Sequence, residues 1–237
     1  MRPEYGETWV YESIIGALPG IHIGPRTALA IQFVGFEVAI VALSWYYNLW
    51  SAAVAGTVAV VVATVGSAEM LRIARRTRDE RTPDAYRRLL FGSNIEVVLA
   101  VLAYVALLTH LFVWDPQTAG TPLVETLFGD EPPAVVVYLT LLVLWDVCYR
   151  IGTGWWASVA ALWRSARFRF DNETRRSLQR ADLETFGFGI LQLAFLPFLT
   201  GQPVLFAVVV GHFCAVAVVI GVSVALLQIK ATDDTAS

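Results

Sequence analysis

Lysine is nearly absent from this sequence, and cysteine is scarce. Of the 17 basic residues only Lys230 is lysine, and it lies at the end of the last apolar run, so no candidate span holds the lysine that a retinal chromophore requires. The two cysteines, Cys148 and Cys214, lie inside apolar runs. This placement favours buried thiols over a disulfide framework.

The sequence also lacks the common catalytic and metal-binding motifs. It contains no HExxH, no GxSxG and no cysteine pair at metal-ligand spacing. The N-terminus lacks the basic region, apolar core and small-residue cleavage site of a signal peptide. Without a catalytic or metal-binding motif, an enzyme ranks last among the functional hypotheses, and no cofactor is predicted.

Apolar residues are what the sequence has in excess. Of its 237 residues, 57% are hydrophobic and only 16% are charged, whereas soluble domains are roughly half apolar and about a quarter charged. This composition predicts an all-α transmembrane bundle with interfacial amphipathic helices. Its six apolar runs predict spans at about 27–47, 50–71, 94–114, 133–153, 183–200 and 204–228.

The remaining segments complete the predicted domain layout. Residues 1–26 alternate apolar and acidic residues and predict an interfacial segment, residues 27–230 form the membrane domain, and residues 231–237 form a polar, disordered cytoplasmic tail. Between the second and third spans, Pro83 with Asp84 is typical of a helix start and Gly92 of a helix end.

The fourth apolar stretch is too long for a simple span. As one helix, residues 133–164 would extend about 48 Å, beyond a hydrocarbon core of about 30 Å. Gly152 and Gly154 therefore predict a break, followed by a helix in the plane of the interface that begins at Trp155. A strongly tilted continuous helix is the competing interpretation.

The arginines set a predicted orientation. They gather in residues 72–92 and 164–185, whereas residues 115–132 hold four acids and no basic residue. Six spans place both basic segments on one side, so the positive-inside rule predicts a cell-membrane protein with both termini cytoplasmic. The basic segments are expected to contact anionic lipid headgroups. Nucleic acid is not an expected partner, because topology and contact with anionic lipid come first as roles for these arginines.

Three charged residues inside the spans form the candidate polar site: Glu37, Asp146 and Arg150. A charge at the bilayer centre costs roughly 2.5–3.5 kcal/mol and needs a partner, a hydrated cavity or neutralisation. Counted from the inner surface, Glu37 lies about 15 Å deep, Asp146 about 12 Å and Arg150 about 6 Å. Because the long Arg150 side chain can reach upward, the three are expected to meet in the inner half of the bundle, as a site for an ion, a proton or an anionic substrate. The structural alternative is a self-neutralising pair of Asp146 and Arg150. Gln32 and Gln192 are expected to form interhelical hydrogen bonds.

The histidines do not favour a haem site. Two axial ligands must lie at matched depths on facing helices, whereas His110 and His212 differ by roughly 7 Å in estimated depth. A hydrogen-bond partner is expected for each histidine instead.

A weak internal similarity also appears. Residues 87–96 and 175–184 share an arginine pair, a leucine and a glutamate at a constant offset. They indicate either three repeated hairpin units, as in many transporters, or a chance likeness of two arginine-rich loops.

The stretches Tyr86–Ser93 and Leu144–Trp156 resemble those of an uncharacterised membrane-protein family of halophilic archaea. The resemblance implies a cell-membrane location and brings no known activity, cofactor or site residue. The first functional hypothesis is a small-solute or ion transporter or channel. The alternative is a non-transporting accessory or scaffold protein, which binds lipid and a membrane partner or a second copy of itself.

Overall fold

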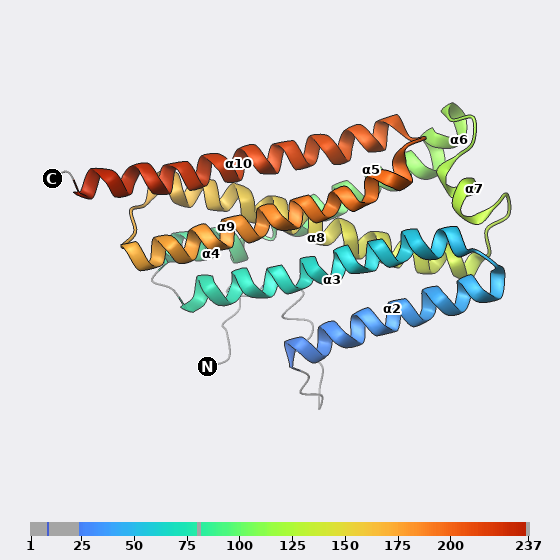
Figure 1. Cartoon of the computed structure of the whole chain (residues 1–237), viewed down its shortest axis with the longest axis horizontal. Helices are drawn as coiled ribbons and strands as arrows, with labels where there is room; N and C mark the ends of the chain where they lie inside the picture. The colour runs from blue at the N-terminus through green and yellow to red at the C-terminus, as the bar shows by residue number, and fades with distance from the viewer. Residues whose placement is uncertain (1–8, 10–23, 80–81, 236–237) are drawn as a thin grey trace.

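The computed structural model describes residue 9, residues 24–79 and residues 82–235. Within these residues the chain is helical, with no strand (Figure 1). Six helical stretches are long and apolar enough to cross a membrane. The prediction of an all-α, six-span bundle is therefore confirmed, and the chain is a multi-pass membrane protein.

Long helices form the spans, and short helical elements lie in the connections between them. The elements are α2 (Pro25–Tyr47), α3 (Trp50–Asp79), α4 (Asp84–Gly92), α5 (Ile95–Thr109), the π-helix η1 (His110–Trp114), α6 (Asp115–Thr118), α7 (Leu123–Phe128), α8 (Ala134–Arg167), α9 (Asn172–Gln192), the 3₁₀ segment η2 (Leu193–Leu199) and α10 (Pro203–Thr235). The helix predicted to start at Pro83 and Asp84 and to end at Gly92 is α4.

Helix α8 lies at the centre of the bundle. It packs against α5, α3, α10 and α9, and more lightly against α4 and α2. Helix α2 lies at the edge, where it packs mainly along α3 (Figure 1). The tight turn between α2 and α3 depends on Asn48, which adopts a left-handed conformation with φ of 58°. Asparagine tolerates this conformation better than most residues.

The predicted break in the fourth stretch is wrong, and the continuous helix is correct. Helix α8 runs through Gly152 and Gly154 for 34 residues, a length of about 51 Å. The two glycines serve close packing instead of flexibility. A Cβ on Gly152 would lie 3.0 Å from the backbone nitrogen of Ala100 on α5, and a Cβ on Gly154 would lie 3.4 Å from the ring of Phe188 on α9. Small residues let helices approach this closely in a membrane.

The two ends of the chain differ from expectation in different ways. Helix α10 continues the last span to Thr235. Most of the tail that the sequence predicts to be disordered is therefore helical. The interfacial segment predicted over residues 1–26 lies almost wholly outside the described residues. Trp9 is described: it is fully buried, donates from Nε1 to the Met70 carbonyl at 3.2 Å, and packs edge-on against Phe91.

The basic segments gather at one end of the bundle. The end of α3, the whole of α4, the end of α8 and the start of α9 lie opposite to α6 and α7 (Figure 1). The α6–α7 end holds the segment of residues 115–132, which has no basic residue. The fold therefore separates the arginines from the acidic connection along the long axis of the bundle.

Candidate functional site

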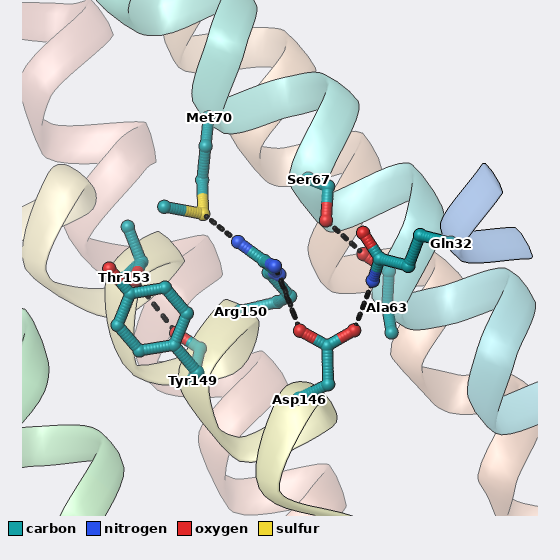
Figure 2. A network of polar contacts seen from close by, with 8 residues as sticks. All are labelled: Gln32, Ala63, Ser67, Met70, Asp146, Tyr149, Arg150 and Thr153. Carbon is teal, nitrogen blue, oxygen red and sulfur yellow. Dashed lines mark hydrogen bonds and ion pairs between the residues drawn. The ribbon is translucent and has the colours of Figure 1, made fainter. Parts of the chain in front are cut away.

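Arg150 is the centre of a polar network between α8, α3 and α2. Its side chain is 1% exposed, and its Nε and Nη2 donate to Asp146 Oδ1 at 3.1 and 2.8 Å. Its Nη1 points at the sulfur of Met70 on α3, 3.2 Å away (Figure 2). Each guanidinium nitrogen therefore has a partner within an apolar bundle.

Local sequence explains how the bundle accommodates the arginine. Asp146 and Arg150 are four residues apart and so lie one above the other on the same face of α8. Gly66 on α3 faces them: a Cβ there would lie 2.7 Å from the Cβ of Arg150. The absence of a side chain at Gly66 thus gives Arg150 its space. Nearby, Ser67 donates to the Ala63 carbonyl of its own helix at 3.0 Å and takes no part in the network.

Gln32 joins α2 to this network. Its Nε2 donates to Asp146 Oδ2, the carboxylate oxygen that Arg150 does not use (Figure 2). The prediction that Gln32 forms an interhelical hydrogen bond is confirmed. Both oxygens of Asp146 accept from a side chain, and the ion pair carries no net charge.

Glu37 does not join the network. Its Oε2 accepts from Thr57 on α3 at 3.1 Å, whereas its Oε1 is buried without a hydrogen-bond partner. Five helical residues separate Gln32 from Glu37, a rise of about 7.5 Å. The structure therefore brings together Asp146 and Arg150 of the predicted site, and it places Gln32 where Glu37 was expected.

A second buried ion pair lies nearer the arginine-rich end. Arg164 on α8 donates from Nη2 to both oxygens of Asp182 on α9, at 2.8 and 2.7 Å. Ser223 on α10 donates to Asp182 Oδ2 at 2.8 Å, and Arg164 also lies over the ring of Tyr86 on α4, 5.4 Å from its centroid. Four helices meet at this cluster, which the sequence analysis missed.

A sequence signal for Asp182 did exist. Leu178, Asp182 and Thr185 recur at helical spacing on the buried face of α9. Arg164 and Asp182 fall in the basic segment of residues 164–185, whose arginines the positive-inside rule assigns to topology. Their burial depends on how far α8 and α9 extend as helices, which the span lengths underestimated.

The single lysine ties α10 to the end of α8. Lys230 Nζ donates to the carbonyl oxygens of Ser165 and Ala166 at 2.8 and 2.7 Å, and to that of Phe168 at 3.3 Å. The last carbonyls of a helix lack partners within the helix, and a cation there also suits the helix dipole. Lys230 thus caps α8 from a different helix.

Two further acids are buried without having been predicted. Glu96 at the start of α5 is fully buried, and neither of its carboxylate oxygens has a hydrogen-bond partner. Glu69 on α3 is 4% exposed. Both lie close to predicted span ends, so their sequence position alone did not separate a buried carboxylate from a solvated one.

A cavity of about 380 Å³ occupies the half of the bundle nearer α6 and α7. Its lining is apolar apart from a few side chains, among them Ser44, Thr140, Gln192 and His212. Glu37, Asp146 and Arg150 are not among the lining residues. The cavity and the ion pair therefore occupy separate parts of the bundle.

The hydrogen-bond partners predicted for His110 and His212 are absent at Nε2, and His22 lies outside the described residues. The Nε2 atoms of His110 and His212 are buried and have no hydrogen-bond partner. The His212 ring lies 5.9 Å from that of Trp155, so ring packing takes the place of a polar contact. Among the described residues, no group of three or more histidine, cysteine or acidic side chains could hold a metal ion.

Comparison with known proteins gives a family but no activity. Residues 4–223 match the model of a family of unknown function, DUF7530. No curated protein and no solved structure matches the chain.

Proposed function

The chain belongs to the family DUF7530, whose function is unknown, and we propose that it is a small-solute or ion transporter or channel. The observation that carries the proposal is the buried pair of Arg150 and Asp146, which Gln32 bridges from α2. Ionisable groups inside a membrane bundle are costly and characteristically mark substrate or ion pathways.

One contact of the network comes from the edge of the bundle. Arg150 and Asp146 both belong to α8, so they remain paired whatever the other helices do. Gln32 comes from α2, the helix at the edge of the bundle, which packs on few neighbours. Displacement of α2 frees Asp146 Oδ2 to accept a proton, a cation or a hydrogen-bond donor of a solute. In this mechanism Asp146 binds the ion or solute, Arg150 holds the carboxylate in position through two hydrogen bonds, and Gln32 closes the site.

Transport is tested with the purified full chain in proteoliposomes. Ion flux and proton uptake are measured under an imposed gradient, and we expect Asp146→Asn to abolish them. Arg150→Lys, which keeps the positive charge, should retain part of the flux. Glu37→Gln is the matched control, because Glu37 lies outside the network. Wild-type flux in Asp146→Asn vesicles would contradict the assignment, and reduced flux in Glu37→Gln vesicles would return Glu37 to the site.

A non-transporting accessory or scaffold protein is the second candidate. It is favoured by the fact that each nitrogen of Arg150 already has a partner, as in a structural ion pair. A scaffold would bind a membrane partner or a second copy of itself. Purification from native membrane followed by mass spectrometry distinguishes the two candidates. A stoichiometric partner together with no flux for any ion would favour the scaffold.

The location of the protein belongs to the same proposal. We place it in the cell membrane with the arginine-rich end of the bundle and both termini in the cytoplasm, where arginines contact anionic lipid headgroups. A halophilic archaeal source remains a prediction from the resemblance of residues 86–93 and 144–156.

A further inference from the structure

Two adjoining cavities lie toward the α6–α7 end of the bundle. The apolar cavity of about 380 Å³ is bordered by Leu123, Leu127 and Phe198. The same three side chains border a second cavity of about 850 Å³ at the α6–α7 end. The two spaces are therefore separated by no more than a layer of apolar side chains.

The inner cavity suits a hydrocarbon chain. It is lined mainly by aliphatic and aromatic residues of α2, α3, α5, α8, η2 and α10. Its volume falls in the range of small-molecule pockets, about 300–1,000 Å³. Small residues on α3, including Ala55 and Gly56, leave the space open on one side. An ion would find few polar atoms here, whereas an alkyl chain would keep its surface in an apolar environment.

The outer cavity has a more polar lining than the inner one, and hydrogen bonds tie its walls together. Asp115 at the start of α6 is 1% exposed and accepts from the backbone of Leu123 at 2.6 Å and from Gln202 at 3.3 Å. These bonds hold α7 and the turn before α10 around the opening. The π-helix η1 supplies His110 and Trp114 to the same wall. Such wide turns occur frequently at functional sites.

The acidic connection around the opening disfavours an anion, and of its four acids Asp115 lines the cavity itself. Residues 115–132 hold Asp115, Glu125, Asp130 and Glu131 and no basic residue. Trp114 lines the cavity and offers a ring face that attracts a cation. The buried Nε2 of His110, which also lines the cavity, has no hydrogen-bond partner.

From this arrangement we infer that the two cavities form one binding site for a single-chain amphiphile with a cationic head. The chain occupies the apolar cavity past Leu123, Leu127 and Phe198, and the head lies against Trp114, at the end of the bundle that carries the four acids of residues 115–132. The site is separate from the pair of Asp146 and Arg150, and so it does not depend on the transport proposal.

The test uses the full chain in nanodiscs of zwitterionic lipid. Equilibrium dialysis measures the binding of radiolabelled dodecyltrimethylammonium against empty nanodiscs, with dodecyl sulfate as the anionic probe of equal chain length. We expect saturable binding of the cation and at least about tenfold weaker binding of the sulfate. Equal binding of both probes, or binding that does not saturate, would overturn the inference, since either result indicates partition into lipid.

Two variants test whether the bound probe occupies the apolar cavity. Ala55→Phe fills the apolar cavity, whereas Ala106→Phe adds the same ring on α5 at an exposed position that does not line it. We expect the first to weaken cation binding at least about tenfold and the second to leave it unchanged. Val209→Phe fills the cavity from α10 and serves if Ala55→Phe does not fold. Unchanged cation binding in a folded cavity-filling variant would contradict the inference. So would an anionic lipid that the wild type retains and Ala55→Phe loses.

Discussion

Arg164 and Asp182 form an ion pair in which one arginine nitrogen, Nη2, donates to both carboxylate oxygens. Both side chains are almost completely buried, at 1% and 3% exposure. Burial of a charge is expensive unless a partner compensates it. The pair is compensated further by Ser223, so that three helices depend on one carboxylate. Variants of this ion pair therefore test the packing of α8, α9 and α10.

We predict that Asp182→Ala destabilises the bundle by about 3–5 kcal/mol, because it leaves Arg164 charged, buried and unpaired. The double variant Arg164→Met with Asp182→Leu should recover most of that stability. Thermal unfolding in detergent measures both. Arg76→Ala is the matched control, since the pair of Arg76 and Glu184 is about one-third exposed and is worth about 0–1 kcal/mol. A single variant no less stable than this control would contradict the prediction.

We predict that Gly152→Val separates α5 from α8. A Cβ at Gly152 meets the backbone of Ala100 at 3.0 and 3.3 Å, and a backbone cannot move aside as a flexible side chain does. Overpacking of this kind costs about 1–3 kcal/mol. Gly211→Val on α10 is the control, because nothing lies within 4 Å of the added Cβ. Equal melting temperatures for the two variants would show that the close approach is not needed.

Asp171 gives a prediction for pH dependence. It caps α9: its carboxylate accepts from the backbone N–H groups of Thr174 and Glu173 at 2.9 and 3.0 Å. The Thr174 N–H is the main cause that lowers the pKa of Asp171 below its ordinary value. A lowered folded-state pKa means that the stabilisation is complete above the unfolded pKa of about 3.9 and is lost as pH falls through the folded value.

The comparison for Asp171 is with Asp171→Asn, which keeps a capping side chain but cannot titrate. We expect the stability of the wild type relative to this variant to be constant near neutral pH and to fall below about pH 4. Thermal unfolding of both proteins across the acidic range measures it. A difference that does not change with pH would show that the charge of Asp171 contributes nothing.

The orientation in the membrane is predicted from the arginines. In a background of Cys148→Ala and Cys214→Ala, a cysteine at Glu125 in intact cells should react with a membrane-impermeant maleimide. A cysteine at Arg176 should react only after the membrane is opened, because the two positions lie at opposite ends of the bundle. Labelling of the Arg176→Cys protein in intact cells would reverse the topology and remove the cytoplasmic placement of both termini.

Two glycines show where prediction from sequence failed. The sequence predicts a helix break at Gly152 and Gly154, because the apolar stretch exceeds the thickness of the hydrocarbon core. The structure uses them as contact points for α5 and α9. A glycine is compatible with both roles, and the choice depends on a neighbouring helix that the local sequence does not identify.

The sequence by itself determined that six helices are apolar enough to span a membrane and that arginines gather at alternate connections. Length and polarity are local properties, and lipid acts on them one segment at a time. It also determined that Asp146 and Arg150 share a helix face, because four residues make about one turn.

The tertiary structure alone decided which side chains meet between helices. Gln32 and Asp146 are 114 residues apart and yet bonded, whereas Glu37 turns to Thr57 instead. A shift of one helix along its neighbour by a single turn exchanges such partners without changing any apolar run. The two cavities at the α6–α7 end likewise depend on the combined shape of several helices. Helix periodicity fixes the face of each side chain, and the packing of helix against helix fixes its partner.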